Sequence, residues 1–482
     1  MKLFANGWQI NMNFFEKKYV PFFLLFIIVF LSRLPFLTAG YGIEEDSWGI
    51  ALAAFHTKFS GVYEPSRFPG HPVQELIYSA LWGYGPIVFN GLSALFSAAG
   101  VVCFSLILKQ LQFKHFFLAA LAFAFIPVYF ISSTYTIDFV WTETFVLIGF
   151  YCLLKDKLIL SGIFLGLAIG CRITSGAMLI PFILIIWQQN NLKNNFINFI
   201  KLSIPLLLVA LISFMPLILQ FGCSFFIYYD QFQYPPITKV LYKMTIGVFG
   251  IIGVLGIFMS LIVILIKRKQ QKTFELFQSK LDKKILIACF LILILYTISY
   301  FKLPQKSGYM IPILPFVIIL FGYYLESTYF KFLCATFLIS SFICSINLTD
   351  KIRGAEYSEY SVLFSVSGQE IFFDPFSGPV FSDYSKRKQK INYTQSIIET
   401  TKKITSKTVI ISGWWWNEIM VTMIPIEQKK MVVFEPYIDD KRINQYLADD
   451  YKIFYLPEQN IYNDQMFKMA VTDSVSKPFN LY

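Results

Sequence analysis

The sequence predicts an α-helical polytopic membrane protein with a small C-terminal α/β domain outside the membrane. Of its 482 residues, 56% are hydrophobic and 15% are charged, and the mean hydropathy is +0.57. A typical soluble domain is about 25% charged and lacks apolar runs of about 20 residues, the length that crosses a hydrocarbon core of about 30 Å. The net charge of +11 reflects Lys and Arg in short links between apolar runs, a pattern typical of cytoplasmic loops and not of nucleic-acid binding.

Eleven apolar runs are predicted to cross the membrane as helices. The first follows Lys17 and Lys18 and lacks a small-residue cleavage site, so it is predicted to be a retained helix and not a signal peptide. The runs are 19–38, 86–108, 115–132, 136–154, 158–171, 173–187, 202–220, 244–266, 285–301, 309–325 and 332–347.

The positive charges predict the orientation of these spans. With the N-terminus in the cytoplasm, every second link is cytoplasmic, and the odd number of spans puts the C-terminal part on the outer face. We therefore expect residues 1–347 to form a transmembrane catalytic domain that includes a first outer loop, 39–85, and residues 348–482 to form a soluble extracytoplasmic domain. The membrane is predicted to be a bacterial inner (plasma) membrane. The cytoplasmic links hold Lys109, Lys114, Lys155, Lys157, Lys193, Lys201, the run 267–284 and Lys331.

Two outer loops are longer than simple turns. In the first, the run Val73–Trp82 is too short to cross the membrane and is expected to lie along the interface. The second, 221–243, is aromatic and ends in a Pro pair, a composition that fits either interface anchoring or substrate contact.

The C-terminal segment alternates between helix and strand patterns, which predicts a small α/β domain with parallel strands. Helices are expected at Gln395–Ile404 and Lys441–Ala448, with a short helix between the first two strands; the strands are expected at Thr408–Ser412, Met431–Phe434 and Lys452–Leu456. The seven cysteines lie in or beside apolar runs without CxxC spacing, so neither a disulfide framework nor a zinc site is indicated.

Three consecutive acids, Glu44, Glu45 and Asp46, follow the first apolar run directly. Alone they would indicate a solvated acidic turn. Other charged residues of the outer face favour chemistry instead, because cations at interface depth can hold the phosphate of a lipid, and a carboxylate can act as general base toward an acceptor hydroxyl. No metal is required for such a transfer, although these acids could bind a divalent ion. The other outer-face residues are Arg67, Asp138, Glu143, Arg172, Asp230, Lys302 and Lys306.

Several of these residues also have a structural explanation. Arg172 lies between two short apolar runs and either faces a wet cavity or an anion, or extends to the surface from a helix end. Asp138 either orients the base or acceptor, or stabilises a helix N-terminus by less than about 1 kcal/mol. If Glu143 is charged, it should face the bundle interior, and His71 is either a loop-structural or a catalytic residue. No P-loop, GxGxxG, HExxH or hydrolase GxSxG motif is present.

An ordered set of motifs in residues 19–325 resembles the GT-C superfamily of integral membrane glycosyltransferases, near the protein O-mannosyltransferases (glycosyltransferase family 39) and the aminoarabinose transferase of lipid A. The resemblance is carried by GYGIEEDSW and GVYEPSRFPGHPVQEL in the first outer loop, FIPVYFISSTYTIDFVWTETFVLIGFYCLLK, SGIFLGLAIGCRITSGAMLIPFILII and KSGYMIPILPF. One departure is that the EED triplet precedes Ser-Trp, where the superfamily often has an acidic pair followed by Tyr.

The resemblance implies a GT-C fold and an inverting transferase that takes a sugar from a polyprenyl-phosphate donor outside the cytoplasm, without a required cofactor. The acceptor would be a glycolipid, a polysaccharide or a protein. Asp46 would be the catalytic base, with Glu45 as the alternative, and Asp138 would be the second acid. Arg172 and Lys306, with Lys302, would bind the donor phosphate. Candidate contacts to donor or acceptor are Glu44, Arg67, His71, Glu143 and Tyr309.

Two other functions fit part of the pattern. A flippase or transporter of lipid-linked oligosaccharide should have ionisable residues in mid-helix and repeated halves with broken helices, but the sequence has no clear internal repeat and its ionisable groups gather on one face. An O-antigen-type polymerase usually has its large outer loop in the centre of the chain, whereas this chain has a large first loop.

Overall fold

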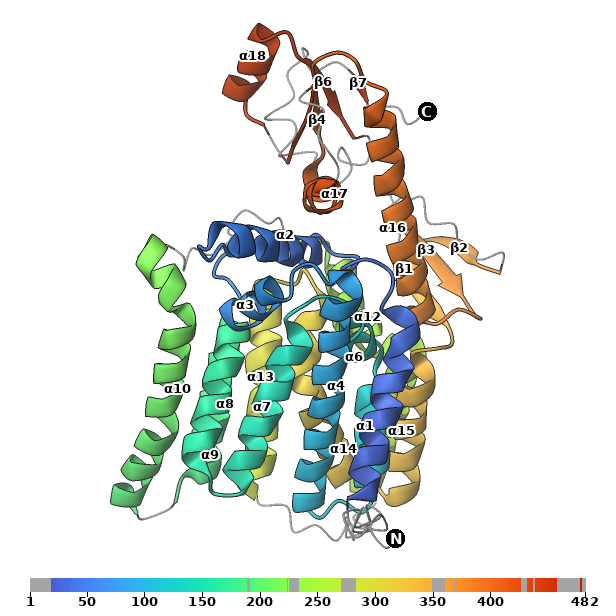
Figure 1. Ribbon diagram of the computed structural model, residues 1–482. Helices are drawn as coiled ribbons and strands as arrows, with labels where there is room; N and C mark the ends of the chain where they lie inside the picture. The colour runs from blue at the N-terminus through green and yellow to red at the C-terminus, as the bar shows by residue number, and fades with distance from the viewer. Residues whose placement is uncertain are drawn as a thin grey trace, which may run out of the picture.

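The structure is a computed structural model that describes residues 19–188, 191–222, 224, 234–269, 283–348, 360–366, 369–425, 431–436, 438–456 and 477–478. Figure 1 shows a bundle of roughly parallel helices with two helices lying across one end, which we call the cap end. The C-terminal strands and helices stand above the cap end, and the first helix of the described chain begins at the opposite end (Figure 1).

Five helical segments of the described part are long and apolar enough to cross a membrane. They correspond to α4 (Gly85–Gln110), α10 (Leu192–Phe221), most of α12 (Ile246–Lys269), α13 (Lys283–Lys302), and η5 (Ser307–Ile313) with α14 (Leu314–Tyr324). Shorter apolar helices complete the bundle: α1 (Val20–Arg33) with η2 (Leu34–Phe36), α5 (Phe116–Ala124), α6 (Pro127–Ser132), α7 (Phe139–Leu154), α8 (Leu158–Cys171), η3 (Ile173–Met178), α9 (Leu179–Ile186) and α15 (Ser327–Ser340).

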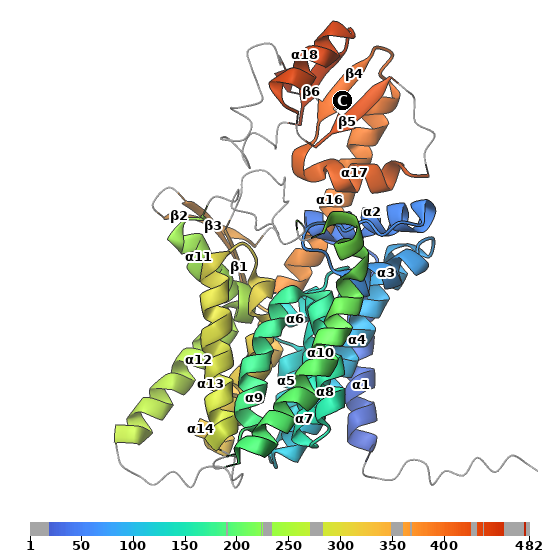
Figure 2. The same ribbon diagram turned by 90° about the vertical axis from the view of Figure 1, so that its left-hand side faces the viewer.

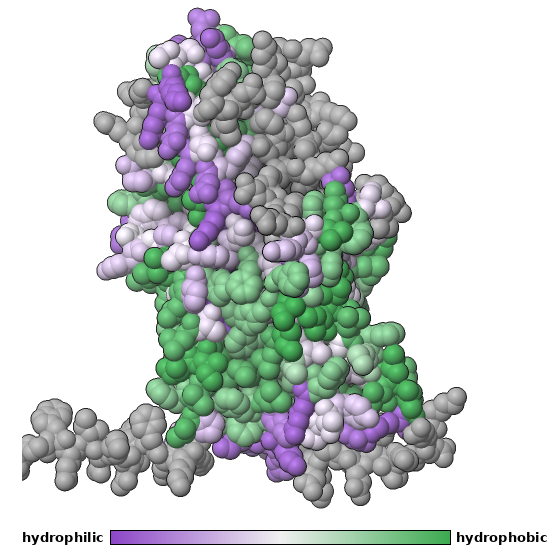
Figure 3. Space-filling model, turned by 90° about the vertical axis from the view of Figure 1, so that its right-hand side faces the viewer, coloured by the Kyte–Doolittle hydropathy of each residue, from purple (hydrophilic) through white to green (hydrophobic). Residues whose placement is uncertain are grey.

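Each predicted apolar run falls on one of these helices or on a pair of them, so the predicted polytopic helical fold is confirmed. Two runs are broken for a local reason. The run 115–132 is divided into α5 and α6 because Ile126 is extended and Pro127 begins a new helix. The run 173–187 begins as the 3-10 helix η3 before it becomes α9. On the face of the molecule that Figure 3 shows, apolar side chains form a broad band over the bundle, with hydrophilic residues at both of its rims.

The first outer loop contains two helices, α2 (Glu45–Ser60) and α3 (Pro72–Ala80), which lie across the bundle at the cap end (Figure 1). The helix α3 covers most of the predicted interfacial run. The helix α2 was not predicted: the acids do not begin an irregular loop but occupy its N-cap and first turn, where the helix dipole favours negative charge. Its side chains from Ser47 to Ala54 are buried, so packing on the bundle end stabilises a helix that the sequence pattern does not indicate.

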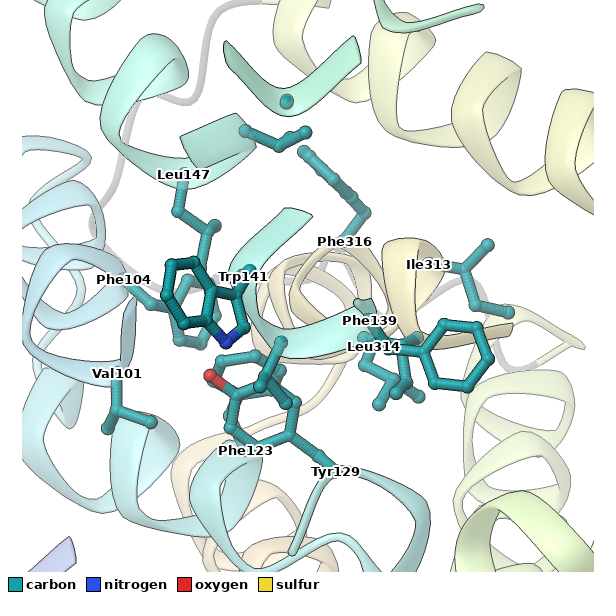
Figure 4. Close-up of a cluster of buried hydrophobic side chains, with 14 of the residues drawn as sticks. Val101, Phe104, Phe123, Tyr129, Phe139, Trp141, Leu147, Ile313, Leu314 and Phe316 are labelled. Carbon is teal, nitrogen blue, oxygen red and sulfur yellow. The ribbon is translucent and has the colours of Figure 1, made fainter. Parts of the chain in front are cut away.

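A tightly packed core holds α7 against its neighbours. Figure 4 shows Trp141 and Leu147 of α7 among aromatic and aliphatic residues of α4, α5, α6 and the η5–α14 segment. The Trp141 ring stacks on Phe96 with 3.7 Å between centroids. This packing gives fixed positions to the start of α7 and to the start of η5, where two of the predicted site residues lie.

The C-terminal part contains two sheets. An antiparallel sheet, which was not predicted, has the order β1-β3-β2, and its first strand spans the predicted domain boundary. A parallel sheet with the order β5-β4-β6-β7 follows, so the predicted parallel α/β arrangement is confirmed. Figure 2 shows the first sheet beside the cap end and the second one above it. The strands are β1 (Ser345–Leu348), β2 (Val362–Val366), β3 (Gln369–Asp374), β4 (Thr408–Ile411), β5 (Val432–Glu435), β6 (Lys452–Tyr455) and β7 (Lys477–Pro478).

Three helices accompany these sheets: α16 (Pro379–Lys402), α17 (Trp416–Met423), which follows the short η6 (Gly413–Trp415), and α18 (Asp440–Ala448). All four residues of β4 are buried, because Ile410 packs into a cluster with α16 and α17 on one face while Val409 and Ile411 pack toward α18 on the other. This two-sided burial explains why β4 is a continuous apolar run.

Candidate active site

At the cap end of the bundle, side chains of opposite charge alternate and form a continuous chain of ion pairs. The Asp46 carboxylate contacts Lys306 Nζ and lies 3.1 Å from a guanidinium nitrogen of Arg67. The other terminal nitrogen of Arg67 lies 3.4 Å from Asp138 Oδ1, and Asp138 Oδ2 accepts a 2.6 Å hydrogen bond from Arg172. The structure therefore brings together residues from α2, the first loop, the start of α7, the α8–η3 junction and the start of η5.

Close packing lets the Lys306 segment approach α7. Lys306 precedes η5, and Gly308 lies two residues later against the ring of Phe139. A Cβ atom at Gly308 would lie 2.3 Å from that ring, so only glycine permits this approach without a shift. Phe139 directly follows Asp138, and the contact therefore sets the distance between the Lys306 and Asp138 segments.

Arg172 points into the protein. Its guanidinium carbon lies 4.7 Å from the centroid of the Phe139 ring and 4.6 Å from that of Tyr309, and its side chain is 16% exposed. Such cation–π contacts and the ion pair with Asp138 fix the guanidinium plane. A small recess beside it is lined by Phe139, Thr142, Arg172, Gly308, Ile311 and Pro312. Of the two explanations that the sequence leaves open, this geometry supports the one in which Arg172 faces inward.

Glu75, which the sequence analysis missed, holds the loop that carries Arg67. Its buried carboxylate accepts hydrogen bonds from the Tyr63 hydroxyl, from the backbone N–H and hydroxyl of Ser66, and from the backbone N–H of His71. A buried carboxylate that binds several donors in one loop fixes the course of that loop. The only sequence signal was an acid inside the apolar run Val73–Trp82.

His71 links this loop to the Arg172 junction. Its ring Nδ1 lies 2.6 Å from the Cys171 carbonyl oxygen, to which it donates, and 3.8 Å from Asp138 Oδ2. Burial lowers the pKa of His71, and the charge of Asp138 only partly opposes this effect. His71 is thus a buried structural connector that also borders the Asp138 carboxylate.

Asn90 of α4, also missed from the sequence, fixes the turn before the acids. Its side-chain amide donates 2.8 Å hydrogen bonds to the carbonyls of Leu37 and Gly40 and accepts one from Thr136. Gly40 has a φ of +61°, and a Cβ atom there would lie 2.8 Å from the Trp48 ring, so the turn requires glycine. An asparagine near the start of an apolar helix was the available signal.

The three acids have different environments. Burial would raise the pKa of Asp46, but the positive charges of Arg67 and Lys306 lower it to about 2. Burial, together with the charge of Asp46, raises the pKa of Glu45 to about 8. Glu44 contacts Lys306, whereas Glu45 accepts a 3.2 Å hydrogen bond from Asn417 of α17. Asp46, and not Glu45, therefore faces the cations of the site.

The remaining predicted residues lie at different distances from this chain of ion pairs. The ring of Tyr309 packs on Arg172, as described above. Lys302 is exposed in the last turn of α13, four residues before the partly buried Lys306. Glu143 is buried in α7, and within the described part of the chain its carboxylate has no hydrogen-bond partner. Residues 223 and 225–233 of the predicted aromatic loop 221–243, including Asp230, lie outside the described residues, and its last part forms α11 (Ile237–Met244).

No group of three or more His, Cys, Asp or Glu side chains suited to a metal ion occurs among the residues that the structure describes. Within the acidic cluster, Glu44 and Asp46 both contact Lys306 Nζ. The positive charge shared by these two carboxylates is thus the Lys306 ammonium. Binding of a divalent ion by the acidic cluster stays a prediction.

Comparison with known proteins extends these observations. No family model matches the sequence, and no curated protein matches it either. The crystal structure of ArnT from Cupriavidus metallidurans in the apo state is similar, with a TM-score of 0.50, 12% identity, and coverage of 92% of this chain and 94% of that chain. Over nearly its whole length, this chain therefore has a fold similar to that of ArnT.

A second crystal structure of ArnT from Cupriavidus metallidurans, bound to undecaprenyl phosphate, matches with a TM-score of 0.43 and 16% identity. That match covers 64% of this chain and spans 59% of the ArnT chain. The helical fold predicted from the ordered motifs is similar to that of ArnT in the apo state over nearly the whole chain. The long apolar helices of this chain are those of an integral membrane protein.

Proposed function

We propose that this protein is an inverting glycosyltransferase that moves a sugar from a polyprenyl-phosphate donor to a glycolipid, polysaccharide or protein acceptor at the outer face of a bacterial plasma membrane. The observation that carries the proposal is the alternation of Lys306, Asp46, Arg67, Asp138 and Arg172 in one chain of ion pairs. The GT-C fold and the ordered motifs of the first 325 residues support it.

The cations of the site fit a phosphate. Arg172 is oriented by Asp138 and by two aromatic rings, and it is one of the residues that line the recess beside Phe139. Lys306 lies two residues before Gly308, which also lines this recess, and its side chain is 20% exposed. A planar guanidinium and a mobile ammonium can bind a phosphate diester and the monoester that it becomes, through charge-assisted hydrogen bonds.

Asp46 would act as the general base. In the inverting step it takes the proton of the acceptor hydroxyl, the acceptor oxygen forms a bond to the anomeric carbon, and the bond from that carbon to the phosphate oxygen breaks on the opposite side. The polyprenyl monophosphate leaves with the electron pair. Because the leaving group is a stable anion that cations already bind, the step needs one base and no separate acid.

The low pKa of Asp46 has a consequence for this role. A carboxylate with a pKa of about 2 is a weak proton acceptor. A donor phosphate would draw Lys306 and Arg67 toward itself, and the pKa of Asp46 would rise toward its ordinary value because its positive neighbours are shared. Donor binding would therefore prepare the base.

Asp138 has a different role in this proposal. It is fully buried and pairs with both Arg172 and Arg67, so its carboxylate orients two cations. Removal of one partner from such a buried network leaves the others uncompensated. Asp138 is thus proposed as the residue that positions the phosphate-binding guanidinium groups, and not as a proton acceptor.

The test is incubation of the purified protein in lipid vesicles with a polyprenyl-phosphate sugar that carries a radiolabel in the sugar. Covalent transfer of the label to an envelope acceptor fraction is the expected result. Asp449→Asn, at an exposed position that ends α18, is the control variant and should transfer at the wild-type rate. Movement of the labelled lipid between leaflets without any covalent product would overturn the proposal and would favour a flippase.

A further inference from the structure

One face of α16 contacts residues 36–46. This segment ends at the proposed base Asp46, and we call it the acid loop. The Tyr384 hydroxyl lies 2.9 Å from Thr38 Oγ1, and Arg387 donates to the Phe36 carbonyl at 3.3 Å. One turn further, Lys390 Nζ donates to the Ile43 carbonyl at 3.1 Å. Residues three apart share one helix face, so a single side of α16 follows the acid loop from its start to the acids.

The helix α17 adds a contact to the acids themselves. Asn417 Nδ2 donates to Glu45 Oε1 at 3.2 Å, and Glu45 is next to Asp46. The backbone of α2 is close at this point, because a Cβ atom at Gly49 would lie 3.3 Å from the same Asn417 nitrogen. Figures 1 and 2 both show α17 directly above α2.

Lys390 joins the two helices of this contact. Besides the Ile43 carbonyl, its ammonium contacts the Glu418 carboxylate of α17 at 3.0 Å and lies 5.2 Å from the centroid of the Trp415 ring. The Glu418 side chain is fully buried. Removal of the ammonium would therefore leave both a buried carboxylate and a backbone carbonyl without this partner.

Arg387 fixes the same helix to the transmembrane part. It is 1% exposed, pairs with Asp383 at 2.8 Å, and donates to the carbonyl and the hydroxyl of Thr134, which lies between α6 and α7. The acid loop is thus enclosed between α16 on one side and the α6–α7 junction on the other. Asp138 follows in that same junction.

We propose that α16 and α17 position Asp46, the proposed catalytic base, with Lys390 and Asn417 as the positioning residues. This inference rests on the proposed function. Neither residue touches the ion-pair chain of the site; each holds the backbone or the neighbour of Asp46. Misplacement of a reacting group by about 1 Å can cost about 100-fold in rate, so loss of these contacts should lower the rate of the chemical step more than donor binding.

Two variants and two matched controls test the inference in the full-length protein. Lys390→Met removes the ammonium, and Asn417→Ala removes the amide. Lys403→Met, at the exposed end of α16, and Asn444→Ala, on the exposed face of α18, carry the same changes elsewhere in the C-terminal part. Lys390→Arg retains a cation that can reach both the carbonyl and Glu418, and it should restore wild-type behaviour.

The first measurement is hydrogen exchange of backbone amides. In Lys390→Met and Asn417→Ala, we expect faster exchange in residues 38–48 and unchanged exchange in α7, with both controls equal to wild type. The second measurement is sugar transfer, with kcat lowered at least about tenfold and the KM for the donor changed less than about twofold. Such a split would not result from general loss of stability.

The outcomes separate this inference from the proposed function. Unchanged exchange of residues 38–48 in both variants, or faster exchange with an unchanged kcat, would overturn the inference. If the wild type transfers no sugar, the proposed function is wrong, and the exchange data still decide whether α16 and α17 hold the acid loop.

Discussion

At the level of single residues, the site assigns different tasks to neighbouring acids. Glu44 and Asp46 contact Lys306, while Glu45 turns toward Asn417. The sequence placed all of these acids near one another but left the base open between Asp46 and Glu45. Glu45 and Asp46 point in different directions because they lie in the first turn of α2. This helix is stabilised by packing on the end of the bundle, which the local sequence does not reveal.

Replacement of Asp46 by Asn should nearly abolish transfer without loss of folded protein. The change retains the volume but removes the proton acceptor, and a positioned general base contributes about 10²-fold to 10⁴-fold. Initial rates of radiolabel transfer, normalised to monodisperse protein, measure the effect. Turnover within about threefold of wild type would exclude Asp46 as the base.

The pH dependence of stability should reveal Glu45. The folded protein retains the Glu45 proton up to about pH 8, whereas the unfolded chain releases it near the ordinary value of 4.5. The folded state therefore binds more protons in this interval, and stability falls as the pH rises from about 5 to 8.

The Glu45→Gln variant stays neutral throughout, so its thermal midpoint in detergent should fall less than that of wild type over this pH range. The comparison is the slope of the midpoint against pH for the two proteins under identical conditions. Parallel slopes would show that Glu45 is ionised at neutral pH.

The two predicted phosphate-binding lysines should differ strongly. Lys306 is partly buried and contacts the carboxylates of Glu44 and Asp46, while Lys302 is exposed at the end of α13. Because hydrogen bonds to charged groups contribute about 1.5–3 kcal/mol, Lys306→Ala should weaken the binding of a polyprenyl phosphate about 10-fold to 100-fold. Lys302→Ala should change the Kd less than about threefold. Equal effects of the two changes would contradict the assignment of Lys306.

At the level of elements, the site depends on short segments that end or interrupt helices. Asp138 precedes α7, Arg172 joins α8 to η3, and Lys306 precedes η5. The apolar runs predicted these junctions well because a span of given length must end near its polar neighbours. The sequence did not predict α2 or the antiparallel sheet, since the first is stabilised by packing and the second by pairing between distant strands.

Gly308→Ala tests how closely the η5 segment approaches α7. The new methyl group would lie 2.3 Å from the Phe139 ring, so Lys306 must shift away from the site or the ring must move. Overpacking of this kind costs about 1–3 kcal/mol, and thermal denaturation should show it together with weaker donor binding.

Gly176→Ala is the matched control for this change, because a Cβ atom there would make only ordinary contact, at 3.7 Å, with Ile169. Its stability should stay within about 0.5 kcal/mol of wild type. A Gly308→Ala protein that is as stable and binds donor as well as the control would refute the packing argument.

At the level of the whole molecule, parts of the chain that are far apart in sequence lie together at the cap end. The first loop, the α6–α7 junction, η5 and the C-terminal helices meet there, while the apolar band of the bundle extends away from it (Figures 1 and 3). Composition predicted the bundle and the parallel α/β sheet. It could not predict that α16 and α17 lie against the acid loop, because nothing in the sequence around single polar residues such as Lys390 and Asn417 marks them as contacts to a distant segment.

The central claim is that Asp46, Arg172 and Lys306 belong to one site that binds the phosphate of a lipid carrier. An electron cryomicroscopy structure of the protein with undecaprenyl phosphate in a lipid nanodisc tests it most directly. We expect phosphate density within hydrogen-bond distance of Arg172 and Lys306, with the Lys306 ammonium moved from Asp46 toward the phosphate. A lipid phosphate bound elsewhere, with the Lys306–Asp46 ion pair unchanged, would contradict the account.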